Sequence, residues 1–380
     1  MGDGKRRAVQ AVATLVAAVL ALLVVVGLMS SRLGQRPTAS AGNATPARLT
    51  AHDYGPPPAG VKLLYLHDPA NASWLTGFDW SGAPSATVKL DGARSGALMA
   101  PDGQTFAIGL NAKGGTWDFL DRLGNPIPAS PGISGGFLPI WADDSKHICS
   151  TGFDTSTLEW RLWTKLPGAE SKLVRLVATD ASLGDSNVRV VGCSFKNDVV
   201  IVERIGQAAS PTEYWLIRLS DGSILLDKKR GGTDMAFLTA SSDAILLAEN
   251  SSKSIGQSDG PALATRIVRA ADGDVVTTLD PSMGVLGFNG DDSAALVTLS
   301  PWVGGQPIHL GVVDLQSGHL VWQDDGRSPW FFGQFVAQPG GNSFAIAYPS
   351  SGNFPSPSTI VIVAADGSAT TLDRQYTPAW

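Results

Sequence analysis

The 380-residue sequence predicts an all-β fold of repeated four-stranded sheets that follows one apolar N-terminal helix. Three observations lead to this prediction. Short apolar segments alternate with turn residues along residues 61–380, and the pattern recurs roughly every 40–50 residues. Glycine is abundant, with 43 residues, while charged residues make up only 16% of the chain. Such a composition favours many tight turns over long helices joined by salt bridges.

The first element is an apolar segment at residues 8–30, which we expect to cross a membrane as a signal-anchor helix. At 1.5 Å per residue it spans a hydrocarbon core of about 30 Å. Lys5, Arg6 and Arg7 precede it, so residues 1–7 are expected to form a short cytoplasmic tail, with the rest of the chain outside. A cleaved signal peptide is the alternative, with cleavage near Ala41 and a secreted product, although the apolar region of a signal peptide is usually shorter.

The second element is a spacer at residues 31–60, rich in Pro and Ala and without an apolar period. The first 60 residues carry six basic and two acidic side chains, which leaves 22 basic against 32 acidic ones in the remainder. An acidic domain without a basic stripe is not expected to bind nucleic acid.

Two turn patterns interleave along the rest of the chain. The first joins two apolar strands and is clearest in ALMAPDGQTFAIGL at residues 97–110. The last residues before the turns of this kind are Met99, Trp141, Cys193, Leu238, Phe288 and Ala337. The second is a hairpin whose turn contains Gly82, Gly124, Gly168, Gly222, Gly273, Gly318 or Gly367. Together the patterns define units of four strands, a to d, and predict a seven-bladed β-propeller. A β-sandwich is the alternative, but a sandwich would not repeat the same turn chemistry at this period.

The end of the chain predicts how the ring of blades closes. TPAW at residues 377–380 matches LPIW at residues 138–141, so Trp380 takes the position of Trp141 in a strand a. The matching strand b is VKLLY at residues 61–65, at the other end of the domain, with Leu63 and Leu64 in the places of Ile148 and Cys149. We therefore expect the C-terminal strand to complete the first blade, which removes open sheet edges. The predicted blades are residues 61–93 with 375–380, then 95–130, 136–178, 187–229, 234–280, 284–325 and 331–373.

The segment APDGQTFAIGL resembles the S-P-D-G-x-x-I-A-F stretch of TolB-like and WD-repeat-like propellers, and STIVIVAADGSATTL resembles the hairpin that follows it. The resemblance covers residues 61–380 and implies the fold. It does not imply a function, because such propellers include binding scaffolds, periplasmic proteins and enzymes. Only the second blade keeps the motif Pro101-Asp102-Gly103, so the subfamily is not assigned.

The residues offer little chemistry. Cys149 and Cys193 fall in adjacent blades, and they form either a disulfide or two small buried thiols. The chain lacks C-x-x-C, paired histidines at metal-ligand spacing and a glycine-rich phosphate loop. We therefore expect no catalytic constellation, no bound metal and no cofactor.

Long b–c and d–a connections on one face of the propeller make a candidate binding face. Its residues are Trp302, Trp330, Phe331, Phe354, Asp324, Asp325, Arg327 and His67. Exposed aromatics beside charges are typical of recognition surfaces. The alternative is that these aromatics fold inward and cap the ends of the blades.

These observations predict a membrane-anchored, extracytoplasmic propeller that acts as a non-catalytic binding or scaffold module in the cell envelope. We expect its partner to be a protein, peptide or glycan. We expect the N-terminal helix to be its only contact with the membrane, and the propeller to be a monomer. The alternative is an extracytoplasmic enzyme, lactonase-like, lyase-like or a hydrolase, with its site at the mouth of the central channel.

Overall fold

In the computed structural model, all described residues belong to one compact unit within residues 51–380. The described residues are 54–68, 71–90, 96–109, 117–128, 139–154, 156–157, 159–178, 187–205, 212–230, 235–236, 246–250, 265–269, 274–280, 283–299, 309–325, 335–350 and 357–379. The predicted membrane helix at residues 8–30 lies outside them. Within the described ranges, no helix is long and apolar enough to cross a membrane.

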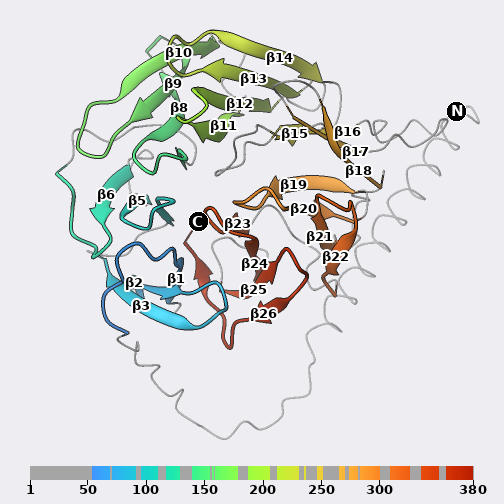
Figure 1. Ribbon diagram of the computed structural model, residues 1–380. Helices are drawn as coiled ribbons and strands as arrows, with labels where there is room; N and C mark the ends of the chain where they lie inside the picture. The colour runs from blue at the N-terminus through green and yellow to red at the C-terminus, as the bar shows by residue number, and fades with distance from the viewer. Residues whose placement is uncertain are drawn as a thin grey trace, which may run out of the picture. The chain divides into compact units, whose positions relative to one another are not determined.

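All secondary structure of the described residues is β-strand, arranged in antiparallel sheets around a common centre (Figure 1). We number the sheets in chain order. Sheet 1 contains, from the centre outward, β27 (Thr377–Pro378), β1 (Leu64–Asp68), β2 (Asn71–Phe78) and β3 (Pro84–Lys89). Sheet 2 contains β4 (Gly96–Met99), β5 (Thr105–Gly109) and β6 (Trp117–Asp121). Sheet 3 contains β7 (Ile140–Trp141), β8 (Ile148–Asp154), β9 (Glu159–Lys165) and β10 (Lys172–Ala178).

The remaining four sheets have four strands each. Sheet 4 contains β11 (Asn187–Ser194), β12 (Val199–Ile205), β13 (Thr212–Arg218) and β14 (Ile224–Arg230). Sheet 5 contains β15 (Met235–Ala236), β16 (Leu246–Asn250), β17 (Thr265–Arg269) and β18 (Val275–Leu279). Sheet 6 contains β19 (Gly284–Phe288), β20 (Ala294–Thr298), β21 (Leu310–Asp314) and β22 (Leu320–Gln323). Sheet 7 contains β23 (Phe335–Ala337), β24 (Ser343–Pro349), β25 (Ser358–Ala364) and β26 (Ala369–Thr371).

This arrangement confirms an all-β propeller, but six sheets rather than seven have the expected four strands. In sheet 2 the place of the fourth strand holds an isolated bridge between Leu120 and Pro126 and one bond from Ile127 N to Phe119 O. Pro126 and Pro128 flank Ile127, and neither has an N–H group to donate. A ladder cannot continue through such a segment, which is the physical reason that the described residues 126–128 add no full strand to sheet 2.

The two ends of the domain pair with each other. In sheet 1, β27 lies antiparallel to β1, with Pro378 opposite Leu66 and Thr377 opposite His67. Figure 1 shows the red C-terminal strands beside the blue N-terminal ones. The register differs by one residue from the alignment with sheet 3, because Leu64 rather than Leu63 corresponds to Ile148. Trp380 itself lies outside the described residues.

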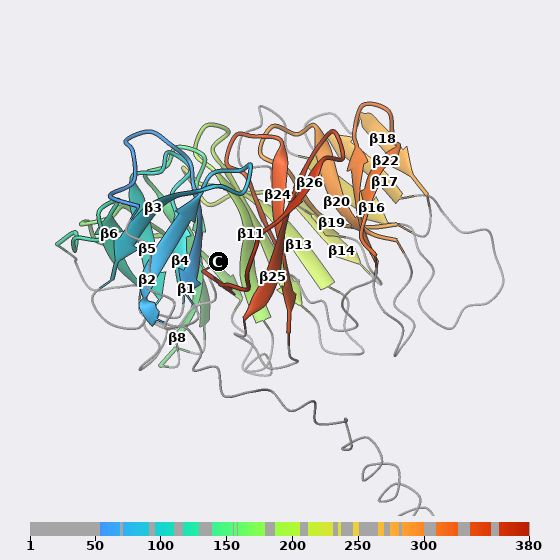
Figure 2. The same ribbon diagram turned by 90° about the horizontal axis from the view of Figure 1, so that it is seen from below.

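Apolar side chains fill the space between neighbouring sheets, whose strands stand side by side in the edge-on view of Figure 2. Leu75 of sheet 1 and Phe106 of sheet 2 are fully buried in one such cluster, and Phe344 of sheet 7 is buried in another. A disulfide joins Cys149 in β8 to Cys193 in β11, with the two Cα atoms 6.2 Å apart, and so links sheets 3 and 4. Successive residues of a strand are expected to be buried where both faces of its sheet are covered.

The hairpin turns follow the predicted glycine chemistry where they are described. Six of the seven turn glycines have a positive φ, among them Gly222 at 71° and Gly367 at 84°. At Gly367 an added Cβ would lie 2.3 Å from the carbonyl oxygen of Val321 in sheet 6, so the turn also needs the close approach that only glycine allows. Gly273 lies outside the described residues.

Candidate functional site

One mouth of the central channel contains a cavity of about 220 Å³. Its walls come from the innermost strands of sheets 2, 3 and 7 and from the start of sheet 1. The lining residues are Lys62, Leu63, Leu64, Tyr65, Trp80, Ala97, Leu98, Met99, Ala100, Pro101, Pro139, Ile140, Trp141, Val336, Ala337, Gln338 and Pro339. The cavity is therefore formed jointly by residues of four sheets, and no single sheet contains it.

The cavity opens on the face formed by the a–b and c–d turns. Pro101 and Gln338 follow the innermost strands β4 and β23, and Trp80 lies in the hairpin between β2 and β3. This is the opposite face from the one that carries the predicted b–c and d–a loops. The sequence did mark the strand ends, since Met99, Trp141 and Ala337 are the residues before the repeated turns, but it did not show that they surround one space.

Few polar groups line this apolar cavity. Lys62 is exposed and donates a hydrogen bond from Nζ to the carbonyl oxygen of Pro339 at 3.0 Å. Trp141 donates from Nε1 to the carbonyl oxygen of Leu98 at 2.8 Å. Trp80 is half-buried, and its Nε1 is buried without a hydrogen-bond partner among the described residues.

Acidic and imidazole side chains are absent from the described lining, which contains no Asp, Glu, His or Cys. In the described part of the chain, no group of three or more such residues could hold a metal ion. The described walls can therefore contact an apolar group beside the ammonium group of Lys62.

Tyr65 also lines the cavity and packs between sheets 1 and 2. It is 4% exposed, and its ring meets the edge of Phe106 with centroids 4.8 Å apart. Burial raises the pKa of the Tyr65 phenol well above its usual value, against the opposing charge of Arg122. Its hydroxyl has no hydrogen-bond partner within the described structure, so Tyr65 stays protonated and neutral at ordinary pH.

On the opposite face, the predicted candidate loops start from one buried cluster. His309 Nδ1 lies 3.2 Å from Asp324 Oδ1, and Tyr348 Oη donates to Asp324 Oδ2 at 3.1 Å. These three residues stand at the ends of the connections 300–308, 326–334 and 351–356, so the roots of three loops meet at one carboxylate. Asp324 is only 7% exposed because it bonds inward to two sheets.

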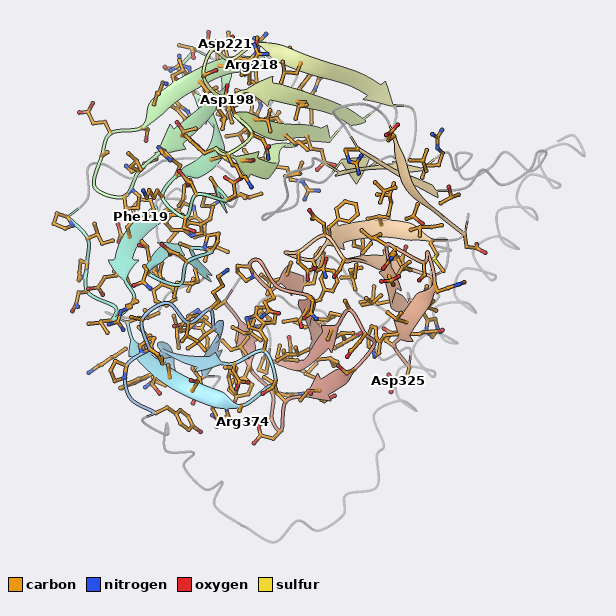
Figure 3. The ribbon with its side chains drawn as sticks, viewed as in Figure 1. Phe119, Asp198, Arg218, Asp221, Asp325 and Arg374 are labelled. Atoms are coloured by element: carbon orange, nitrogen blue, oxygen red, sulfur yellow. A yellow bond between two sulfur atoms is a disulfide. The ribbon has the colours of Figure 1, made fainter. Side chains whose placement is uncertain are left out.

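The other residues of the predicted binding face divide into two groups. Asp325 is exposed, beyond the end of β22, as Figure 3 shows. The second group lies in the loops outside the described residues and consists of Trp302, Arg327, Trp330, Phe331 and Phe354. The structure thus brings the stems of the predicted face together but does not describe its aromatic tips.

His67 does not lie on a surface. It is 3% exposed within β1, opposite Thr377, and the neighbouring Asp68 lies 3.7 Å from Arg374. Arg374, labelled in Figure 3, also donates from Nε to Tyr376 Oη at 2.7 Å. These contacts connect the incoming C-terminal segment to β1, so we assign His67 and Asp68 to the closure of the ring.

The hairpin turns hold their aspartates ionised. In Figure 3 Asp221 lies near Arg218, and its Oδ1 accepts a hydrogen bond from the backbone N–H of Ser223 at 2.8 Å. Hydrogen bonds from the side chain and backbone of Ser223 lower the pKa of Asp221 to about 2. Side-chain hydrogen bonds from Ser317 and Ser368 likewise lower the pKa of Asp314 and Asp366. Such carboxylates stabilise turns.

No protein-family model matches the sequence, and no curated protein matches it. Solved structures are similar in fold. One, from an analysis of two prolyl endopeptidases, is 12% identical and covers 83% of this chain and 49% of that chain, with a TM-score of 0.51. TolB from Acinetobacter baumannii is 13% identical and covers 75% of this chain and 65% of that chain, with a TM-score of 0.42. An oligogalacturonate lyase in complex with manganese is 12% identical and covers 83% and 85%, with a TM-score of 0.48.

Likeness at such identities shows the fold alone. This chain spans about half the length of the prolyl endopeptidase that it matches. The structures similar to it include TolB as well as enzymes, so the similarity in fold does not select a function. The strand order makes the chain a β-propeller, and its fold is similar to that of the prolyl endopeptidase structure.

Proposed function

We propose that this chain is a membrane-anchored, extracytoplasmic β-propeller that acts as a non-catalytic binding module, with its ligand site in the cavity at the a–b mouth of the channel. The observation that carries the proposal is the character of that cavity. Its described walls are mainly apolar, with the cation Lys62, the amide Gln338 and no carboxylate or imidazole. A concave apolar site with a few polar groups is the usual form of a binding pocket.

We further propose that the propeller has seven blades, so that the three-stranded sheet 2 counts as a blade beside the six four-stranded sheets. The bridge at Pro126 and the bond from Ile127 supply a short remnant of its fourth strand. The pairing of β27 with β1 supports a closed ring, which leaves no wide edge for a second copy, and we propose a monomer.

The proposed location outside the cytoplasm has two supports. The apolar segment at residues 8–30 follows a basic tail, as in a single-pass anchor. The disulfide between Cys149 and Cys193 is of the kind that persists in oxidising compartments. We therefore propose a protein or peptide of the cell envelope as the partner.

The binding proposal is tested with an apolar fluorescent probe, anilinonaphthalene sulfonate, which combines an aromatic body with an anion. We expect one site per chain. Ala337→Phe should abolish that site by filling the cavity, because Ala337 is half-buried and lines it. Ala369→Phe, on the exposed strand β26, is the matched control and should leave binding unchanged. Equal probe binding by the two variants, at equal melting temperature, would refute the cavity as the site.

An enzyme is the second candidate function, and the observation that favours it is the contact between His309 and Asp324 on the opposite face. A carboxylate on Nδ1 orients an imidazole so that Nε2 can act as a base. If this chain is an extracytoplasmic lactonase, lyase or hydrolase that uses His309 as its base, its His309→Gln variant should lose turnover. Unchanged turnover in that variant, on whichever ester, lactone or uronate substrate the wild type accepts, would exclude His309 as the base.

A further inference from the structure

We propose that the outer wall of sheets 3 and 4 rests on the surface of an anionic lipid membrane, as a second contact beside the N-terminal helix. The inference rests on the proposed membrane anchor, but it concerns a different surface from the cavity at the a–b mouth. It is argued from three features of the outer strands β10 and β14: their exposed apolar side chains, their closeness to each other and their basic residues.

Strand β10 presents two leucines, Leu173 and Leu176, to solvent. Leu173 lies opposite Trp163 of β9, and Trp163 lies opposite Ser150 of β8. Ser150 is two positions from Ile148, which packs against sheet 2, so this face of sheet 3 is the one turned toward sheet 2. The described part of sheet 2 has three strands and provides no outermost strand to cover Leu173, which is 47% exposed.

Exposed apolar side chains continue on the neighbouring outer strand, where Ile224 and Leu225 begin β14. The two outer strands are close to each other, since Arg175 of β10 donates from Nη1 to the carbonyl oxygen of Gly222 at 2.6 Å. Gly222 lies in the turn that leads into β14, and Figure 1 shows β10 and β14 on the same side of the ring. Single exposed leucines are ordinary, whereas a group of them marks an interaction surface.

The same two strands concentrate positive charge. Their basic residues are Lys172, Arg175, Lys228, Lys229 and Arg230. The two strands contain one acidic residue, Asp227. The outer strands of sheets 5, 6 and 7, which are β18, β22 and β26, contain no basic residue. Because the protein as a whole has a net charge of -6, this sector of the wall is positive within an acidic molecule.

Cations beside exposed leucines suit the interface of an anionic membrane. Lys and Arg side chains attract anionic headgroups, while their apolar stems and the leucines enter the boundary between headgroups and acyl chains. A nucleic acid would pair with the cations but leave the leucines in water. The proposed anchor also keeps the membrane within reach, because residues 31–53, which lead to the first described residue, can extend to about 80 Å at most.

Contact through the outer wall leaves both ends of the channel uncovered. The sheets stand side by side in the edge-on view of Figure 2, and the outer strands form the wall between the two ends. A propeller that rests on this wall has its axis along the membrane plane. The cavity at the a–b mouth then stays open to a ligand while the domain is docked.

The full chain in lipid nanodiscs tests this contact. Leu173→Cys is labelled with the polarity-sensitive dye nitrobenzoxadiazole; Cys149 and Cys193 form a buried disulfide and do not react. We expect emission at shorter wavelength with phosphatidylglycerol than with phosphatidylcholine alone, and reversal by salt, which screens charges. Lys172→Gln/Lys228→Gln should lower the ratio of docked to free propeller about thirtyfold.

The chain offers a matched control for each change. Val275 is 46% exposed at the start of β18, an outer strand without a basic residue, so the label at Val275→Cys should emit alike in both lipids. Lys62 and Lys146 are exposed on the face of the a–b turns, and Lys62→Gln/Lys146→Gln removes the same charge. That variant should keep the shift at position 173. Equal responses of test and control, for the label or for the charge, would overturn the proposal.

Four other outcomes would also overturn it. An equal shift in the two lipids would exclude the cations as the cause. A shift in detergent that grows with protein concentration would mean a contact between copies. A shift that appears only when an acidic soluble protein is added would make that protein the partner. An unshifted label on chains that stay in phosphatidylglycerol nanodiscs would refute this inference alone, whereas chains that leave the nanodiscs would refute the proposed anchor and this inference with it.

Discussion

Reduction of the disulfide between Cys149 and Cys193 should lower the free energy of unfolding by about 4 kcal/mol. The two cysteines are 44 positions apart in the sequence. A cross-link stabilises a protein mainly by restricting the unfolded chain, by about 3 kcal/mol for a 15-residue loop and about 4.7 kcal/mol for a 100-residue loop at 25 °C. A loop of 44 residues falls between these values, at about 4 kcal/mol. This is a large fraction of the stability of an ordinary domain.

The assay compares urea unfolding of one protein in two redox states. The wild type is unfolded and refolded with or without reductant, because Cys149 is fully buried and Cys193 is 3% exposed in the folded state. Tryptophan fluorescence then reports the midpoint and slope of each transition. The reduced protein should unfold at lower urea, and a Cys149→Ala/Cys193→Ala variant should not respond to reductant. Superimposed curves for the oxidised and reduced wild type would refute the reasoning, since the unfolded chain would then gain no freedom from reduction.

Three further predictions concern other parts of the propeller. Deletion of Gln375–Trp380 removes β27 from sheet 1 and should lower the melting temperature and protease resistance of the whole domain; unchanged values for both would contradict a ring that closes through this strand. Tyr65→Phe removes a buried hydroxyl that has no partner among the described residues and should raise the free energy of unfolding by about 1 kcal/mol in urea titrations; a lower value would mean that the hydroxyl is bonded. The pKa of Asp221 falls from 3.8 to about 2 on folding, so its contribution to stability is complete above about pH 4 and disappears as the pH falls through 2. Carboxyl NMR of Ser223→Ala should show that pKa moving back toward 3.8, and an unchanged midpoint would exclude Ser223 as the cause.

The repeat made the fold predictable because local chemistry and the fold agree at each turn. Gly222 and Gly367 have the positive φ that the repeated hairpins require, and the β-strand that ends in TPAW pairs with β1 as its likeness to LPIW suggests. The one-residue error in that register arose because sequence similarity aligns residue types, whereas the pairing is decided by which side chains reach the core. The incomplete sheet 2 follows from Pro126 and Pro128, a local feature visible in the sequence but outweighed by the expectation of a uniform repeat.

The candidate sites were less predictable because each is assembled from distant segments. The sequence predicts Asp324 as part of an exposed recognition face, but its carboxylate contacts His309 and Tyr348 and is buried. The sequence also places His67 on that face, but His67 pairs with Thr377 in sheet 1 and is buried. Both side chains face partners that a single strand does not reveal.

By itself the sequence determined the all-β class, the four-stranded period and the joining of the two chain ends, since these depend on turn residues and alternating apolar positions that act locally. Only the tertiary structure decided where a ligand could bind. Lys62 and the carbonyl oxygen of Pro339 meet at 3.0 Å although they are 277 positions apart. Trp80 and Trp141 reach the same cavity from different sheets. A space enclosed by four sheets has no counterpart along the chain, because its shape depends on how those sheets pack around the axis.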